Sequence, residues 1–569
     1  MIVLFESYSY RKEDIERYIP DWMLRIRNDS EQVSLPYVGY AYIERAGDAV
    51  FFLPKIFVDG NGLAFGTTEP SDLISPHGLS TLGNSALAKR LYSLSMWIYE
   101  SVKIYRDSST DYEVKLTEEK SAKSVISYEK GESSHTMMEI FFSFLDFHRE
   151  NKELFIRRKY SANRGERICW HRTVSKVQPV IQDEVPYYPH HKASVQRIDY
   201  EEELLTLYYS VIEFFRKEFG YQVYTDPNYN LITGSRFTSL LEGKGLRKLR
   251  AIKNHYFSDT FVRLWKLLYL FFDICSEIKV SSEYEEVLIT DNYPMVFESM
   301  IDSLIGDRPG KNGMKKFYSE QKDGKRVDHI YRDYDLFSDE HIYFIGDSKY
   351  YRSGSLASGE SVEKQFTYAK NVIQYSTDPY SVRTQTGLRY RDDLTEGYNI
   401  TPNFFISAVI DKDYEASMDS IRKIGKPEFS CQFKDRLFDR DTLTVHRYSI
   451  NFLFVLSAYI SRDGFTKDNF RKKARREFRR DIINYLNERY LLFRVYPDSS
   501  STCADIVTAN FRKYCGRMYA LSRDSSFFIM AFERNEQESL ESDTVQRQEE
   551  LQKIKGVGVA EYYRLSGEL

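Results

Sequence analysis

Hydrophobic residues recur along the chain in both strand-length and helix-length patterns. Near the N-terminus, the apolar run over 49–58 predicts a strand, and the periodic spacing around 86–104 predicts a helix. Further helical patterns occur over 136–150, 200–219 and 236–254. We therefore expect an α/β unit over residues 1–125 and a mainly helical region over 126–255.

The pattern changes at residue 256, where long helices begin to alternate with strands. Helices are predicted over 257–279, 294–305 and 361–375. Strands are predicted over 326–332, 341–350 and 402–410. This order is typical of a mixed sheet flanked by helices, which we assign to a domain spanning 256–495. Residues 496–569 form a C-terminal extension with a strand over 526–532 and then a charged helix or tether.

The composition is that of a globular protein and excludes several classes. Hydrophobic residues make up 42% of the 569 residues, and 80 Lys and Arg nearly balance 84 Asp and Glu. A uniformly basic nucleic-acid coat is excluded, so any polyanion site must be a local patch. Five scattered cysteines argue against a disulfide framework or a structural zinc site. No apolar run reaches the about 18 residues of a membrane span, so we expect a cytoplasmic protein without membrane contact.

The clearest candidate chemistry lies on the two strands predicted over 326–332 and 341–350. Asp328 lies on the first, and Asp347 and Lys349 end the second. Residues two apart in a strand project from the same face, so the Asp347 and Lys349 side chains are expected together. Carboxylates are ligands that suit Mg²⁺, and an adjacent ammonium can orient an attacking water and offset developing negative charge. The pattern therefore predicts a magnesium-dependent phosphodiesterase site.

The flanking helices supply further candidate residues. On the helix over 294–305, Glu298 lies away from the apolar stripe and can bring a further carboxylate. The helix over 361–375 leaves Lys364, Gln365 and Tyr368 near the site. Plainer alternatives remain open: a surface ion pair for Asp347 with Lys349, a solvated carboxylate for Glu298 and an exposed amide for Gln365.

These residues together resemble a known nuclease superfamily. Glu298, Asp328, Asp347-Ser-Lys349 and Lys364-Gln365-Phe-Thr-Tyr368 resemble the PD-(D/E)XK nucleases. The run IGDSKYY followed by KQFTYA is similar to the LlaJI restriction endonucleases, relatives of McrC, as are GERICWHRT and the segment 436–460. The resemblance covers about residues 160–495. It departs from the superfamily at Val327, where Pro is usual, and at the three-residue spacing of Gln365 and Tyr368.

The resemblance implies a DNA endonuclease subunit of a bacterial restriction system that cuts foreign double-stranded DNA. It implies one or two Mg²⁺ ions held by Asp328 and Asp347 with Glu298 as an auxiliary ligand, Lys349 as the residue orienting water, and Gln365 as a helper. It also implies a separate McrB-like AAA+ NTPase, and no P-loop motif occurs in this chain. By analogy with McrC, the unit over 1–125 is a candidate for docking to this partner or for DNA recognition. We expect an oligomeric assembly, because one such site cuts one strand. The alternative is a non-catalytic adaptor that binds DNA or stimulates the NTPase through a relic nuclease fold.

A basic helix is the main candidate DNA contact outside the acidic site. Phe470, Ala474, Phe478 and Ile482 form its apolar stripe. The remaining surface carries Arg471, Lys472, Lys473, Arg475, Arg476, Arg479 and Arg480. Because such a density of unpaired cations repels itself, phosphate contact is favoured over a solvated face.

Two other segments leave alternatives open. Lys364 is either a phosphate contact or a solvated charge. Trp170, in GERICWHRT, is expected in the core, with a partner-docking or DNA-facing turn as the alternative.

Overall fold

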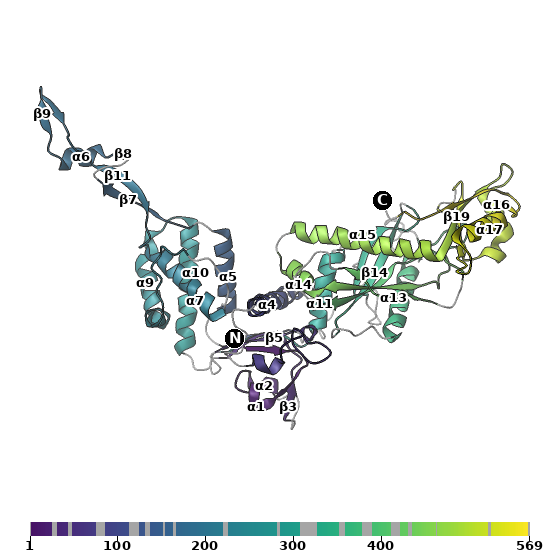
Figure 1. Ribbon diagram of the computed structural model, residues 1–569, viewed down its shortest axis with the longest axis horizontal. Coiled ribbons are helices and arrows are strands. Elements are labelled where there is room, and N and C mark those ends of the chain that lie inside the picture. The colour runs from purple at the N-terminus through teal and green to yellow at the C-terminus, as the bar shows by residue number, and fades with distance from the viewer. Residues whose placement is uncertain are drawn as a thin grey trace.

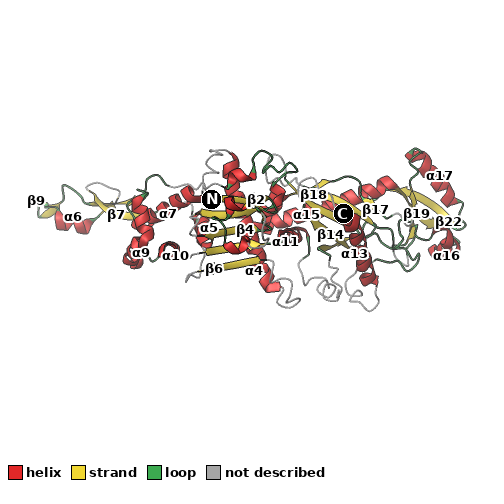
Figure 2. Cartoon of the chain, turned by 90° about the horizontal axis from the view of Figure 1, so that it is seen from below, coloured by secondary structure: helices red, strands yellow, loops and turns green. Residues whose placement is uncertain are grey.

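The molecule is elongated and built from several units in a row (Figure 1). A computed structural model describes residues 2–24, 31–43, 48–74, 86–112, 125–130, 137–151, 154–162, 167–219, 226–280, 285–307, 327–338, 340–351, 359–377, 390–410, 421–430, 435–461, 464–521 and 525–566. Seen from below, a thin arm, the N-terminal sheet, a second sheet and a C-terminal module follow one another along the long axis (Figure 2). The chain is thus an α/β protein with more than one sheet.

The N-terminal unit is a five-stranded sheet. Its strands in spatial order are β1 (Ile2–Phe5), β5 (Asp48–Leu53), β4 (Val38–Ile43), β12 (Glu285–Thr290) and β6 (Val125–Lys130). Helix α4 (Ala86–Tyr112) packs against β4 and β12. Because β12 pairs with both β4 and β6, the boundary predicted at residue 256 does not coincide with a change of unit.

A helical region lies between β6 and β12 in the sequence. It contains α5 (Met137–Glu150), α7 (Glu203–Phe219), α8 (Ser235–Ser239), α9 (Gly245–Ile252) and α10 (Asp259–Val280). Helix α10, predicted as the first element of the nuclease domain, packs instead against α5, α7 and α9. Gly245 permits the close approach of α9, because a Cβ there would lie 2.6 Å from the Phe272 ring of α10.

A narrow arm, described over residues 157–162 and 167–198, projects from this helical region (Figure 1). It is formed by β7 (Arg157–Ala162), β8 (Arg167–Ile168), α6 (Trp170–Lys176), β9 (Val180–Gln182), β10 (Val185–Tyr187) and β11 (Ala193–Ile198). Trp170 is 56% exposed, so the expectation that it lies in the core is wrong. Val174, Ile181 and Tyr187 of the arm are exposed as well, whereas Thr173 of α6 and Ala193 of β11 are buried.

The second sheet is mixed and flanked by helices, as predicted. Its strands are β13 (His329–Tyr334), β14 (His341–Lys349), β15 (Asn403–Val409), β18 (Thr444–Asn451) and β16 (Arg422–Lys423), with β17 (Glu428–Phe429) paired to β18. β14, β15 and β18 run parallel, and β13 is antiparallel to β14. The flanking helices are α11 (Tyr293–Ile305), α13 (Gly359–Thr377), α14 (Phe452–Ile460) and α15 (Gly464–Arg489).

Aromatic residues on β15 separate the two faces of this sheet. Phe404 stacks on Phe478 of α15 with ring centroids 4.6 Å apart. The next residue, Phe405, points to the other face and packs against Val362 of α13. Side-chain alternation along β15 therefore places α15 and α13 on opposite faces.

The C-terminal module has a hydrophobic core of its own. It contains β19 (Tyr490–Pro497), α16 (Cys503–Tyr514), β20 (Met518–Tyr519), β21 (Phe528–Glu533), α17 (Leu540–Gln552) and β22 (Val557–Tyr563). The strand predicted over 526–532 is confirmed as β21, and the charged stretch after it forms α17. None of the helices in the described ranges is long and apolar enough to cross a membrane.

Candidate functional site

Two aspartates meet where β13 and β14 pair. His329 lies opposite Gly346 in this antiparallel pair, so Asp328, directly before β13, lies beside Asp347. The two carboxyl groups share a hydrogen bond. The backbone N–H of Ser348 also donates to Asp328 Oδ2 over 3.4 Å. Strand pairing therefore brings together two acids that lie in separate predicted strands.

The environment of this acid pair favours retention of a proton. Burial, the hydrogen bond with Asp347 and repulsion from Glu298 and Asp347 together raise the pKa of Asp328 well above its ordinary value. The positive charge of Lys349 opposes this effect. Two carboxylates this close repel one another, so a proton or a cation bound between them is stabilised.

Lys349 lies against the same acid pair. Its Nζ atom forms an ion pair with Asp347 Oδ2 and lies 5.4 Å from the centre of the Phe405 ring. Burial, the largest single influence, lowers the pKa of Lys349, but the ion pair with Asp347 and the charges of Tyr351 and Asp328 together raise the net pKa, so the amine is held as an ammonium. Apart from this ion pair, Asp347 Oδ2 is buried without a hydrogen-bond partner in the described part of the chain.

Glu298 approaches the pair from α11. Its side chain is partly exposed, and its negative charge contributes to the raised pKa of Asp328. Among the residues that the structure describes, no three His, Cys, Asp or Glu side chains are gathered closely enough to hold a metal ion. The structure thus joins Asp328, Asp347 and Lys349 directly, and the role of Glu298 as an auxiliary ligand stays a prediction.

Helix α13 carries the three residues named from the sequence, but they differ in exposure and contacts. Gln365 is only 1% exposed, and its Nε2 donates to Asn403 Oδ1 over 2.7 Å. Asn403 Nδ2 returns a hydrogen bond to the Gln365 carbonyl over 3.1 Å. Gln365 is therefore no exposed amide, and it ties α13 to the start of β15. Lys364 is exposed on the same helix.

Tyr368, also on α13, lies close enough to the two aspartates to be affected by their charge. Burial and the negative charges of Asp328 and Asp347 raise the pKa of its hydroxyl. Asn403, by contrast, was not singled out in the sequence. Its role was hard to predict, because a single polar residue at the start of an apolar strand does not indicate that a glutamine on another element will bond to it.

The seven cations predicted on the basic helix do not share one role. On helix α15, Arg471 Nη2 donates a hydrogen bond to the Ser303 carbonyl over 2.9 Å, and Arg479 Nη1 donates one to the Tyr334 carbonyl over 2.6 Å. Arg475 Nη2 donates to the Ile305 carbonyl over 2.7 Å and to Asp307 Oδ1 over 2.8 Å. These arginines bind the C-terminal end of α11 and the end of β13, where carbonyl oxygens attract cations.

The premise of seven unpaired cations is therefore wrong. Arg480 also has an internal partner, because it pairs with Glu477. Lys472 and Arg476 are exposed, and DNA contact by them and by Lys473 and Arg480 stays a prediction. Arg471, Arg475 and Arg479 instead hold α15 against the rest of the second sheet.

Replacement of Arg475 by alanine is expected to destabilise the second sheet rather than to weaken DNA binding selectively. The change removes hydrogen bonds to Ile305 and Asp307 and a contact with the Tyr331 ring, whose centre lies 4.2 Å from the guanidinium carbon. A charged hydrogen bond contributes about 1.5–3 kcal/mol, so the melting temperature should fall by several degrees.

Arg476→Ala is the matched control for this variant, because Arg476 is exposed on the same helix. It should leave the melting temperature nearly unchanged. If Arg476 contacts DNA, its loss should lower the salt slope of DNA binding by about 1. Calorimetry and binding titrations at several salt concentrations measure both effects. An Arg475→Ala protein that melts like the wild type would contradict the internal role.

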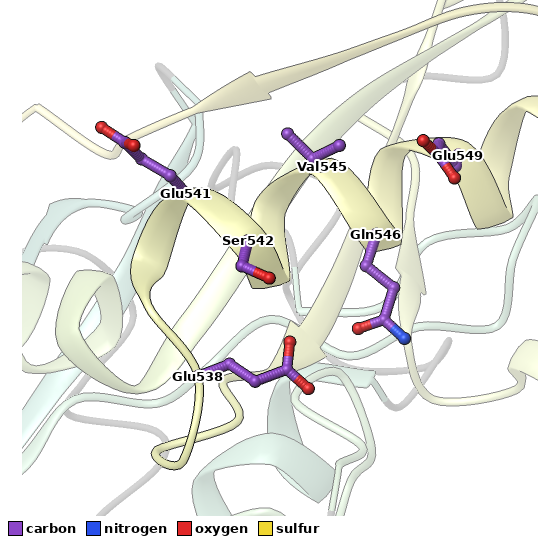
Figure 3. A pocket seen from close by; sticks show the side chains of 6 residues that line it. All are labelled: Glu538, Glu541, Ser542, Val545, Gln546 and Glu549. Carbon is purple, nitrogen blue, oxygen red and sulfur yellow. The ribbon is translucent and has the colours of Figure 1, made fainter.

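A surface hollow on the C-terminal module has a different character from the acid pair. It is lined by Glu538, Glu541, Ser542, Val545, Gln546 and Glu549. Figure 3 shows these side chains along one side of α17 and the loop before it. Its glutamates repel phosphate groups, so this hollow does not fit a polyanion.

Comparison with known proteins gives the class of this chain. A family model described as LlaJI restriction endonuclease matches residues 93–406, which is more than half of the chain. The match includes Glu298, Asp328, Asp347, Lys349 and Gln365. The class is thus that of restriction endonucleases, proteins of restriction systems. Within it, this chain belongs to the LlaJI restriction endonuclease family.

The family resemblance found in the sequence is confirmed, although the matched region begins before residue 160 and ends before residue 495. It ends within β15, so it includes the arm and excludes α15. No curated protein and no solved structure matches the chain.

Proposed function

We propose that this protein is the magnesium-dependent DNA endonuclease subunit of a bacterial restriction system, with a nuclease domain of the PD-(D/E)XK type. The observation that carries the proposal is the meeting of Asp328, Asp347 and Lys349 on paired strands. The substrate is foreign double-stranded DNA, and the reaction is hydrolysis of its phosphodiester bonds. The family membership of the chain supports this class of reaction.

The acid pair fits a magnesium ion. Mg²⁺ commonly uses one or two carboxylates, with waters and substrate phosphate completing its shell, so Asp328 and Asp347 suffice without a third protein ligand. The raised pKa of Asp328 supports the fit, because it favours a nearby cation, and Asp347 Oδ2 already attracts the Lys349 ammonium. When bound, Mg²⁺ would neutralise phosphate charge and make water a stronger nucleophile.

The side chains around the pair have separable tasks. The Lys349 ammonium, held beside Asp347, is placed to orient the attacking water and to stabilise negative charge on the phosphate. Glu298 adds a carboxylate at the edge of the site. Gln365 acts indirectly, since it holds α13, and therefore Tyr368, over the acids.

We also propose a separate McrB-like AAA+ NTPase as partner, and the arm as its docking surface. The arm carries exposed Trp170, Val174, Ile181 and Tyr187, and several large apolar side chains exposed on one projecting segment favour a protein contact. A dimer or larger assembly would supply the second active site needed to cut both strands.

The test is cleavage of double-stranded DNA by the purified chain with and without the NTPase, its nucleotide and Mg²⁺. Cleavage should require Mg²⁺, disappear with EDTA and increase with the partner. Trp170→Ala should reduce the partner-dependent part while leaving the Mg²⁺ requirement unchanged. If the chain stimulates the NTPase but never cuts DNA, the non-catalytic adaptor is the correct interpretation.

A further inference from the structure

A buried junction joins the N-terminal sheet to the strand that carries the candidate site. Tyr350 directly follows Lys349 at the end of β14 and is 5% exposed. Its hydroxyl donates a hydrogen bond to Glu6 Oε2 over 2.6 Å. Glu6 directly follows β1. This single contact therefore connects the edge strand of one sheet to the catalytic strand of the other.

The Glu6 carboxylate is held firmly on its own side of the junction. Glu6 is 5% exposed, and its Oε2 also accepts from the Lys55 backbone N–H over 3.1 Å. The Lys55 ammonium lies 3.7 Å from Glu6 Oε1 and 4.8 Å from the centre of the Tyr350 ring. A buried carboxylate is costly without such partners, so loss of the Tyr350 hydroxyl leaves a polar group poorly satisfied.

The Tyr350 ring also contacts the helix that carries Glu298. Its centre lies 5.6 Å from the Tyr293 ring and 6.0 Å from the Phe297 ring, both on α11. Phe297 directly precedes Glu298. The Tyr293 hydroxyl lies 3.3 Å from Ser101 Oγ of α4. Both α11 and β14 are thus supported from the N-terminal unit through the same aromatic group.

The geometry of a strand explains how this junction acts on the lysine. Neighbouring side chains of a strand point to opposite faces, so Tyr350 and Lys349 project in opposite directions from adjacent backbone positions. Because the Tyr350 side chain is held on one face of the strand, the backbone at Lys349 is held as well. The Lys349 ammonium on the other face therefore keeps its position beside Asp347. Without the anchor, the last residues of β14 can rotate or shift.

We propose that Tyr350 and Glu6 are positioning residues of the nuclease site, and that the N-terminal sheet is part of the support that aligns Lys349. This inference rests on the proposed nuclease function. Neither residue touches DNA or the acid pair. Both act through the backbone of β14, and displacement of a reacting group by about 1 Å can lower a rate about 100-fold.

The test uses the full chain with its partner and compares Tyr350→Phe, Glu6→Ala and Glu6→Gln. Tyr350→Phe and Glu6→Ala should each lower kcat for DNA cleavage by about 10- to 100-fold, with KM for DNA unchanged. The double variant should be no worse than Glu6→Ala alone, because Glu6→Ala already removes the hydrogen bond that Tyr350→Phe removes. Glu6→Gln keeps an acceptor oxygen and should retain most of the activity.

A second measurement does not depend on cleavage. Lys349 is protected by its ion pair, and its side chain is 18% exposed. Its rate of acylation by an amine-reactive reagent, followed by peptide mass spectrometry, should rise several-fold in Tyr350→Phe and Glu6→Ala. Tyr208→Phe is the matched control, because Tyr208 is also buried and its hydroxyl lies 2.8 Å from His148 Nδ1 in the helical region. It should change neither kcat nor acylation of Lys349.

The other possible results of these experiments also decide for or against the inference. Wild-type kcat in folded Tyr350→Phe and Glu6→Ala overturns the inference, and so does a loss of kcat with unchanged acylation, since the effect would then not pass through Lys349. If acylation rises as expected but even the wild-type chain never cuts DNA, the junction stands and the nuclease function fails. Should Tyr350→Phe not fold, Glu6→Ala tests the same contact from the other side.

Discussion

Lys349→Met should abolish DNA cleavage in practice, with kcat lowered by about 10²–10³-fold. Methionine keeps an unbranched side chain that can still lie over Phe405, but it removes the ammonium beside Asp347. The charge that develops on the phosphate then loses its fixed cation, and the water loses its orienting group. Single-turnover cleavage of a plasmid substrate, with Mg²⁺ and the partner NTPase present, measures this loss.

Two comparisons show whether the loss is chemical. Lys513→Met is the control for removal of a lysine, because Lys513 is exposed on α16 and pairs only peripherally with Glu550. It should cut DNA at the wild-type rate. Lys349→Met should also retain the melting temperature of the wild type to within a few degrees and still assemble with the partner. Undiminished cutting by folded Lys349→Met would reject the assignment of this residue.

Asp347→Asn should remove both cleavage and stabilisation by magnesium. Asparagine has nearly the size of aspartate but lacks the negative charge that pairs with Lys349 and attracts a cation. A ligand present at about 100 times its Kd stabilises a folded protein by about 2.7 kcal/mol. Mg²⁺ should therefore raise the melting temperature of the wild type and of Lys349→Met, which keeps both carboxylates, but not that of Asp347→Asn.

The same calorimetric series should depend on pH in a definite direction. The pKa of Asp328 is raised in the folded chain, so the folded state binds its proton more tightly than the unfolded state does. Stability without Mg²⁺ should then decrease as the pH rises from the ordinary aspartate pKa through the raised one. Asp347→Asn should weaken this decrease, because it removes a neighbouring negative charge. Equal pH dependence of the two proteins would contradict the coupling of the acids.

Much of the second sheet was predictable because its signals are local. The strands bearing Asp328 and Asp347 are short apolar runs, and two-residue alternation places Asp347 and Lys349 on one face without knowledge of the fold. β12 was missed as a member of the N-terminal sheet for the opposite reason. Its pairing with β4 is set by contacts across more than two hundred residues, which no local pattern reports.

The side chains that were misjudged depend on distant partners in the same way. The spacing of Arg475 is that of any exposed helix position, and only the folded chain brings it to the Ile305 carbonyl. Gln365 is buried in the folded chain, where its Nε2 donates to Asn403 on another element. Trp170 was expected in the core since large aromatic residues usually are, but it lies on the arm and is 56% exposed.

The pairing of β6 with β12 has a consequence for how such proteins can diversify. These strands are antiparallel neighbours, with Lys130 opposite Glu285, so the chain leaves the sheet and returns at the same place. Everything from 131 to 284, including the arm, is topologically an insertion between adjacent strands. A short hairpin turn joining Lys130 to Glu285 would keep the five-stranded sheet paired, so the inserted region can change in length and shape without altering the order of strands in that sheet.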